Sequence, residues 1–393
     1  MEKITPITRF YRPELDGLRF FAFFLVFLQH LPMAEGFYVG PWSVFVNSFE
    51  KIHLRGWMGV DLFLCLSSYL IAKLLFLEWK MTGQISAKHF FLRRIFRIWP
   101  LYFLACLLSF LIFPLLGWLG PSFGDVSYHG LIQTYLMPYL CLMGNWVTAV
   151  DGYAPVKTLA LLWTISLEEQ FYVMSPFLLR LAKFEKKSIL KVFGFLLVVT
   201  IVARIAAVIM GTHYPFIWVS TLTRLDPLAL GTCLALFEDD LVPLTRRFPA
   251  WAFALIGLGL LEIVFLLPNM DPQTINVVWQ YFILDCGFCC LIFAASQPGR
   301  FQRFFSLWVF TQLGKISYGL YVYHVWAFSI TSLVLMGAIS RFGLRLNLFV
   351  FEVLEMLIGL GITIIISLVS YHCFEKTFLK LKNRFSTIQS RPI

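Results

Sequence analysis

Apolar residues in this chain gather in long runs separated by short polar segments. A helix needs about 20 mostly apolar residues to cross the hydrocarbon core of a bilayer, and ten runs come close to that length or exceed it. They are 16–32, 56–79, 98–118, 160–181, 190–211, 216–237, 250–268, 274–296, 316–338 and 347–371. The pattern therefore predicts an all-α fold, a polytopic integral membrane helical bundle with about ten transmembrane helices.

A further stretch, 129–147, is ambiguous because polar residues and Pro138 interrupt it. We interpret it as an interfacial or re-entrant helix. The first run ends without the small-residue cleavage pattern of a signal peptide, so we expect it to remain as a helix. The sequence has no internal repeat and no appended soluble domain. It therefore predicts a single membrane-embedded domain over 1–393, with a core at about 11–378 and a basic cytoplasmic tail at 379–393.

The charges indicate how the bundle is oriented. Lys and Arg number 32 against 22 Asp and Glu, a formal net charge of +10. With 59% hydrophobic and only 14% charged residues, the chain is not an average soluble domain, so we do not expect a nucleic-acid partner. If the N-terminus is cytoplasmic, 23 of the 32 basic residues fall on the cytoplasmic side. The positive-inside bias favours this arrangement, with both termini cytoplasmic, and opposes counting 129–147 as a crossing.

Several ionisable side chains fall inside the apolar runs, where each costs at least about 2.5–3.5 kcal/mol. Arg19 and His30 are eleven residues apart, so on a helix their side chains differ in direction by only about 20° and lie about 16 Å apart along the axis. The two residues therefore share one helix face. We expect Asp61, Glu168 and Glu169 at a depth comparable with His30. A histidine beside carboxylates in a water-poor cavity is typical of general-base catalysis. Alternatively, the buried charges pair with one another and specify helix packing.

Two other patterns carry candidate chemistry. Arg94 and Arg97 stand three apart in the loop after the second run, with Arg93 beside them. They could anchor the protein to anionic headgroups or clamp a phosphate, and their spacing does not separate these two roles. Cys286 and Cys289 have the spacing of half a zinc site but no second pair and no neighbouring histidine. We expect them to be packing residues, and we expect no metal site.

Seven sequence blocks resemble the acyltransferase-3 membrane family. Arg19 with His30 is similar to its Arg-x10-His signature, 56–71 to GVDLFFVLSGFLI, 91–102 to RRxxRIxPxY, and 163–172 to WSLxVEEQFY. The later blocks run from Arg224 to Gly231, from Ser317 to His324, and from Ser370 to Lys376. The blocks occur in the family's order and cover about residues 11–378. Ser68 replaces the usual glycine of the second block, and Lys376-Thr377 replaces the usual Glu-Lys-Pro ending.

The resemblance implies an O-acyltransferase of the bacterial inner membrane. It would move an acyl group, usually acetyl, from cytoplasmic acyl-CoA to a hydroxyl of a lipid-linked or envelope glycan at the outer face. Such acceptors are lipopolysaccharide O-antigen, exopolysaccharide and peptidoglycan. No permanently bound cofactor is implied, because acetyl-CoA or another acyl-CoA is a substrate. The other partner is the lipid bilayer.

The resemblance also assigns roles to residues of this chain. The catalytic candidates are His30, Asp61 and Glu168, with Asp61 or Glu168 orienting the imidazole. The donor-binding candidates are Arg19, Arg93, Arg94 and Arg97. The supporting candidates are Ser67, Trp163, Ser166, Glu169, Tyr172, Arg224, Asp226, His324 and Glu375. Direct transfer and relay through a covalent acyl-enzyme both remain open.

The alternative from another functional class is a membrane transporter or flippase for an anionic lipid or metabolite. It predicts repeated halves or helices broken at corresponding points, and the sequence shows no such symmetry. A structural or sensory membrane protein is a further alternative.

Overall fold

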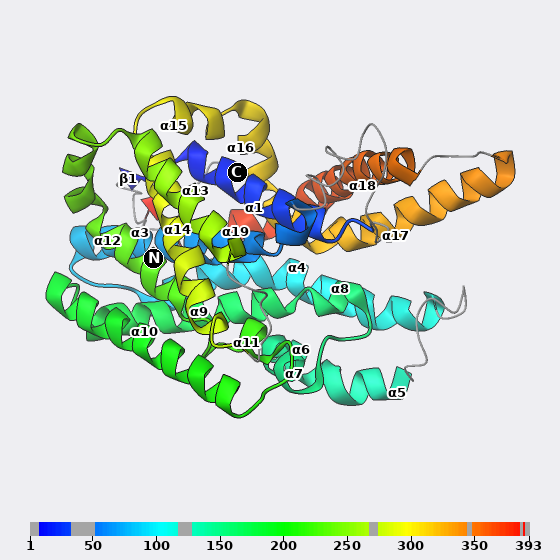
Figure 1. Ribbon diagram of the computed structural model, residues 1–393, viewed down its shortest axis with the longest axis horizontal. Helices are drawn as coiled ribbons and strands as arrows, with labels where there is room; N and C mark the ends of the chain where they lie inside the picture. The colour runs from blue at the N-terminus through cyan, green and yellow to red at the C-terminus, as the bar shows by residue number, and fades with distance from the viewer. Residues whose placement is uncertain are drawn as a thin grey trace.

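The computed structural model describes residues 8–32, 52–116, 128–266, 274–343, 348–385 and 388–389 (Figure 1). In these ranges the chain is almost entirely helical. One short parallel pairing joins the strands β1 (Thr8–Arg9) and β2 (Ile388–Gln389). The all-α class is therefore confirmed, and the described parts of the N- and C-terminal segments meet at one end of the bundle.

Each of the ten apolar runs contains a helix. These helices are α1 (Pro13–Gln29), α3 (Met58–Thr82), α4 (Ala87–Leu116), α9 (Trp163–Leu181), α10 (Lys186–Ile209), α12 (Asp226–Leu241), α13 (Ala250–Leu266), α14 (Val277–Ser296), α17 (Ser317–Phe342) and α18 (Leu348–Ser370). Within the described residues, six helices are long and apolar enough to cross a membrane, or seven if the pair α12–α13, bent by 115°, is one span. The chain is thus a multi-pass membrane protein.

The ambiguous stretch forms interrupted short helices. α5 (Tyr128–Leu131), the π-helical turn η2 (Ile132–Leu136) and α6 (Met137–Leu140) follow one another, and α7 (Gly144–Asp151) begins after a turn. α8 (Lys157–Ala160) precedes α9. Leu142 in the turn has a φ of 58°, so no continuous helix runs through the stretch. Each of its pieces is too short to span a bilayer by itself.

The run 216–237 is not one helix, contrary to the sequence pattern. α11 (Phe216–Val219) ends, residues 220–225 leave the helix, and α12 starts at Asp226. Side chains satisfy the freed backbone groups, as backbone inside a membrane requires. Asn145 Nδ2 donates to the Val219 carbonyl at 3.2 Å, and Arg204 Nε donates to the Thr223 carbonyl at 2.8 Å.

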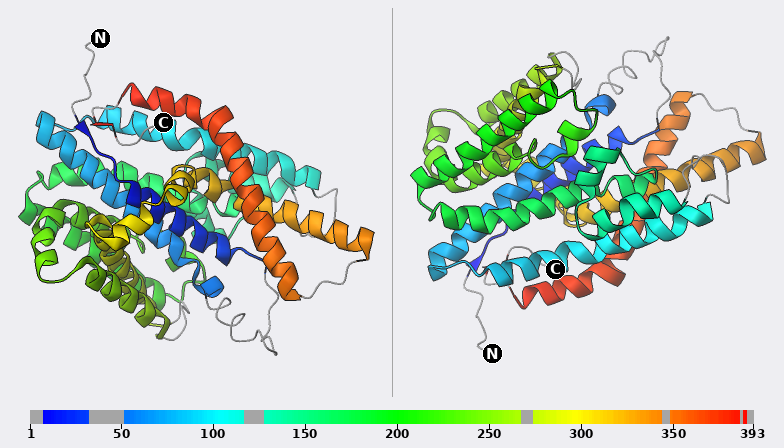
Figure 2. Two further views of the ribbon diagram at one scale, coloured as in Figure 1. Left: turned by 90° about the horizontal axis from the view of Figure 1, so that it is seen from above. Right: turned by 90° about the horizontal axis from the view of Figure 1, so that it is seen from below.

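The two ends of α1 define the two ends of the site. We call the end where α1 begins the basic end and the end where it finishes the histidine end. Figure 2 shows α1 and α3 passing through the middle of the bundle, with α17 and α18 projecting from one side. The remaining elements are η3 (Val242–Arg246), α15 (Arg300–Phe305), α16 (Trp308–Lys315), the π-helical turn η4 (Tyr371–Glu375) and α19 (Lys376–Asn383).

Helix α1 is held close to α16 by a glycine. A Cβ added to Gly314 would lie 1.9 Å from the Asp16 carbonyl oxygen, so any side chain there would force the two helices apart. This contact fixes the first turns of α1, and with them the position of Arg19 at the basic end.

Candidate active site

Two pockets adjoin along α1. The basic pocket, at the basic end, has a volume of about 750 Å³, and the inner pocket has a volume of about 640 Å³. Arg19 and Arg97 line both, so they mark the junction. The pockets therefore form one path from the basic end into the bundle.

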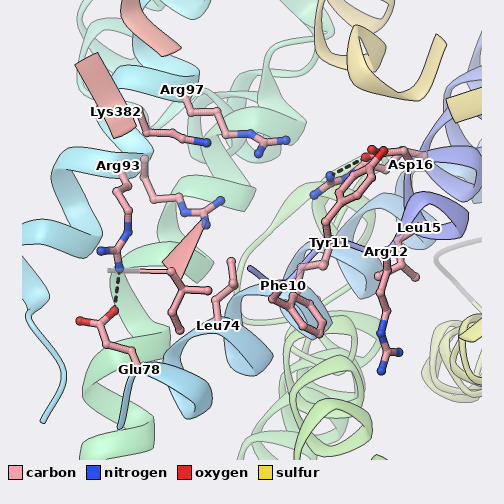
Figure 3. A pocket seen from close by; sticks show the side chains of 14 residues that line it. Phe10, Tyr11, Arg12, Leu15, Asp16, Leu74, Glu78, Arg93, Arg97 and Lys382 are labelled. Carbon is pink, nitrogen blue, oxygen red and sulfur yellow. Dashed lines mark hydrogen bonds and ion pairs between the residues drawn. The ribbon is translucent and has the colours of Figure 1, made fainter. Parts of the chain in front are cut away.

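The basic pocket collects positive charge. Among the described residues, six cationic side chains line it against two carboxylates, Asp16 and Glu78 (Figure 3). The cations are Arg12, Arg19, Arg93, Arg94, Arg97 and Lys382. Such a lining favours an anionic ligand, because close like charges repel one another unless a counter-charge is bound.

Arg94 and Arg97 have the freest guanidinium groups of this lining. Helix α4 places them three residues apart, and Arg94 lies over the rings of Phe90 and Tyr172 at 5.5 and 5.2 Å. In the described part of the chain, neither arginine has a carboxylate within ion-pair distance. Both can therefore present their planar fork of donors to a phosphate.

Arg93 has partners of its own. Its Nη2 donates to Glu78 Oε2 at 2.8 Å, and its Nη1 donates to the carbonyl of Phe385 at 2.9 Å. Arg93 thus ties α4 to the end of α3 and to the segment after α19. Arg19 has a longer contact, 3.5 Å from Nη1 to Asp16 Oδ1.

The inner pocket contains a carboxylate with two hydroxyl partners. Ser67 on α3 and Tyr172 on α9 both donate to Glu168 Oε1. Tyr172 is one turn beyond Glu168 on the same helix face, and Arg19 lines the same pocket. One turn before Glu168 on α9, the hydroxyl of Thr164 lies 2.7 Å from that of Tyr321 on α17.

A pair of histidines lies beyond the inner pocket, at the histidine end. His324 on α17 is fully buried, and its Nε2 lies 3.4 Å from Nδ1 of His30, the exposed residue that follows α1. His30 Nδ1 is also 2.9 Å from the Val26 carbonyl, and His324 Nδ1 is 2.7 Å from the Tyr321 carbonyl. A ring nitrogen that contacts a carbonyl must carry the hydrogen, so each neutral ring keeps its lone pair on Nε2.

The structure places the expected histidine–carboxylate partners elsewhere. Asp61 forms an ion pair with Arg224, and both side chains are fully buried. Glu168 is engaged by Ser67 and Tyr172 and shares the inner pocket with Arg19, so it does not lie beside His30 as the span boundaries suggested. The side-chain partner of the His30 ring is therefore His324 rather than a carboxylate.

The ion pair at Asp61 belongs to a larger buried cluster. Arg204 on α10 pairs with Asp226, and both are fully buried. The Arg224 guanidinium also lies over the rings of Tyr281 and Trp218, at 4.1 and 4.5 Å. Nothing local in the sequence marks Asp226 as the partner of Arg204. This cluster holds the unwound segment 220–225 against α3 and α10.

The other supporting candidates join helices around the pockets. Glu169 Oε2 accepts from Trp99 Nε1 at 3.0 Å, the Gly144 N–H donates to Ser166 Oγ at 3.2 Å, and Glu375 Oε1 accepts from Ser370 Oγ at 3.1 Å. The Trp163 ring packs at 5.6 Å from that of Trp218. Over the described residues, no group of three or more His, Cys, Asp and Glu side chains is arranged to hold a metal ion.

The adjoining pockets and the histidine pair belong to a chain that matches a known family. The acyltransferase-3 family, described as an acyltransferase domain, matches residues 12–372. The chain belongs to this family. It is 25% identical over 327 residues to an O-acetyltransferase, OatA, of Staphylococcus aureus, covering 80% of this chain and 50% of that protein.

Two further relatives carry similar names. A peptidoglycan O-acetyltransferase of Listeria monocytogenes is 25% identical over 353 residues, covering 85% of this chain and 52% of the relative. A putative O-acetyltransferase of Staphylococcus aureus is 24% identical over 389 residues, covering 94% and 58%. The chain thus spans about half the length of the curated relatives it matches first. No solved structure shows a significant match.

Proposed function

We propose that this protein is a membrane O-acyltransferase that moves an acetyl group from acyl-CoA to a hydroxyl of an envelope glycan. The observation that carries the proposal is a basic pocket that adjoins an inner pocket at Arg19 and Arg97, with the histidine pair next to Tyr321 of the inner pocket lining. Its membership of an acyltransferase family and its resemblance to O-acetyltransferases support this reaction.

We also propose ten spans, with the basic end in the cytoplasm and the histidine end at the outer face of a bacterial inner membrane. All ten apolar runs contain helices, and the N- and C-terminal segments meet at the basic end. Under this topology 23 of the 32 basic residues are cytoplasmic, which follows the positive-inside rule. The donor would then enter from the cytoplasm and the acceptor from outside.

The donor fits the chemistry of the two pockets. The phosphates of acyl-CoA would lie against Arg94 and Arg97, whose forks bind phosphate oxygens in pairs. The thin pantetheine arm would pass Arg19 and extend through the inner pocket towards His30, about 16 Å away along α1. This arm carries hydroxyl and amide groups, for which the hydroxyls of Ser67 and Tyr321 offer partners.

The histidine pair can perform the proton transfers. His30 Nε2 holds a lone pair and would take the proton of the acceptor hydroxyl as its oxygen attacks the thioester carbonyl. The new carbon–oxygen bond forms, the carbon–sulfur bond breaks, and the proton passes to the departing CoA thiolate. While His30 is an imidazolium, its Nδ1–H faces two acceptors, the Val26 carbonyl and the lone pair on His324 Nε2, and both would stabilise the positive charge.

The test is mass spectrometry of envelope glycans from cells that carry defined variants. His30→Ala should abolish the ester, while His213→Ala, which changes another exposed histidine, should leave it unchanged. If His30→Ala is present at normal abundance and still acylates the glycan, the assignment of His30 is wrong. The mass difference identifies the acyl group, and the affected fraction identifies the acceptor among peptidoglycan, lipopolysaccharide O-antigen and exopolysaccharide.

A second experiment tests the donor site in detergent. Replacing Arg94 and Arg97 by glutamate should weaken binding of acetyl-CoA, because two phosphate donors become two repelling carboxylates. Charge reversal at Lys187 and Lys191, two exposed cations on α10, is the matched control. Unchanged affinity in the arginine variant would return Arg94 and Arg97 to the role of lipid anchors.

A further inference from the structure

The C-terminal segment contributes to the basic pocket although it lies beyond the family match. That match ends at residue 372, and the sequence pattern places 379–393 in a polar tail. In the structure, however, Lys382 on α19 and Ile388 in β2 both line the pocket. Figure 3 shows Lys382 and Arg97 extending into the same space.

Three kinds of contact hold this segment in place. Helix α19 packs along α4, and Arg93 donates to the Phe385 carbonyl at 2.9 Å. The Phe385 ring stacks on Phe96, with centroids 5.8 Å apart and planes within 9°. Ile388 pairs with Thr8 in the short β1–β2 ladder. The segment is therefore a built wall of the pocket and not a loose appendage.

Lys382 lies among cations in this wall. Its relative exposure is only 7%, and the charges of Arg97, Arg94, Arg93 and Arg19 all act against its own. An anionic ligand in the pocket would offset this mutual repulsion of the lining. Lys380, two residues earlier on the same helix, is exposed to solvent. The fold thus brings Lys382 into the pocket and leaves Lys380 outside.

We propose that Lys382 is a phosphate ligand of the donor site, and that the C-terminal segment is part of the binding site for acyl-CoA. The inference rests on the proposed donor function of the basic pocket. CoA carries a diphosphate and a separate phosphate on its ribose. Two arginine forks and one ammonium on adjacent walls can bind phosphates at more than one point. An anionic lipid headgroup offers the same chemistry and is the alternative source of phosphate.

The experiment measures CoA binding to the purified full-length protein by calorimetry in detergent. Lys382→Met keeps the length and apolar stem of the side chain but removes its charge, and Lys380→Met on the same helix is the matched control. One charge-assisted hydrogen bond is worth about a tenfold to a hundredfold change in affinity. We expect Lys382→Met to weaken CoA binding by that factor, Lys382→Arg to retain most of it, and Lys380→Met to change it less than about twofold.

Thermal unfolding with and without CoA supplies a readout that a purely structural lysine would not change. A ligand that binds the folded protein raises its unfolding temperature, and Lys382→Met should gain less stabilisation from CoA than wild type does. A Lys382→Met protein that gains the full wild-type stabilisation from CoA would overturn the inference.

The outcomes separate this inference from the proposed function. If wild type binds no CoA, the donor function of the pocket itself fails. Suppose instead that wild type binds CoA, that replacing Arg94 and Arg97 by glutamate abolishes this binding, and that Lys382→Met retains it. In that case only the proposed role of Lys382 fails. A titration with phosphatidylglycerol in the same detergent tests the lipid. Loss of lipid binding with unchanged CoA affinity in Lys382→Met would assign the site to a headgroup and overturn the inference.

Discussion

Asp61 is the residue for which sequence and structure assign different roles, and a double-mutant cycle separates them. The sequence expects a group that orients His30, whereas the structure pairs Asp61 with Arg224, with both side chains fully buried. Removing one partner of a buried ion pair leaves an uncompensated charge and typically costs about 3–5 kcal/mol. Asp61→Leu and Arg224→Met should therefore each destabilise the protein by about that amount.

The double variant should recover most of the loss. Replacing both partners by apolar side chains of similar volume is often close to neutral, because no charge remains buried. The free energies of unfolding of the two single variants should consequently not add, and the coupling should amount to several kcal/mol. The exposed pair of Arg55 and Glu262 is the control. Arg55→Ala should cost no more than about 1 kcal/mol, because solvent screens that pair.

The assay is unfolding in mixed micelles by titration with sodium dodecyl sulfate, followed by tryptophan fluorescence. The same preparations are then tested for transfer to a glycan acceptor. If Asp61→Leu keeps its stability within about 1 kcal/mol of wild type and loses transfer, Asp61 acts in the reaction and the packing argument is refuted. If stability falls as expected and the double variant regains both stability and transfer, Asp61 has a structural role.

Three further predictions concern other parts of the fold. His324→Ala should lower kcat at least about tenfold with little change in KM for acetyl-CoA, measured by steady-state kinetics, because His30 loses one of the two acceptors that its Nδ1–H faces, the other being the Val26 carbonyl. Gly314→Val should destabilise the protein by at least about 1–3 kcal/mol in the same unfolding titration, because the new Cβ would lie 1.9 Å from a backbone oxygen. Gly337→Val is the control and should not destabilise it by that amount, because a Cβ at Gly337 would meet open space. Glu168→Gln should raise KM for acetyl-CoA in steady-state assays, because a neutral amide changes the hydroxyl network lining the inner pocket; an unchanged KM would remove Glu168 from the donor path.

The helices could be predicted from the sequence because hydropathy over 20 residues is a local property. Each apolar run contains a helix, including the first, which is only 17 residues long. The break at 220–225 could not be predicted in this way. Ser220, Thr221, Thr223 and Arg224 make this segment more polar than the residues before it, but a window of 20 residues averages that difference over the whole run. The groups that stabilise the unwound backbone, Asn145 and Arg204, come from distant parts of the chain.

The site could be predicted as a set of residues but not as a set of contacts. The motifs identify His30, Arg94 and Arg97 because these residue types stand at characteristic spacings. The contacts of each side chain could not be predicted, because they depend on how each helix is rotated about its axis. A shift of one residue turns a side chain by about 100°, so the depth of Asp61 in the membrane does not tell whether it faces His30 or Arg224.

The same reasoning explains why Lys382 escapes a motif-based search. Lys380 and Lys382 look alike in the sequence, and both fall in the predicted basic tail at 379–393. What distinguishes Lys382 is the face of α19 that packs on α4, and this face is fixed by contacts of other residues, such as the stacking of Phe385, three positions further on, on Phe96. Phe385→Ala should therefore weaken CoA binding without removing a charge. If it does not, the position of Lys382 is set by α19 alone.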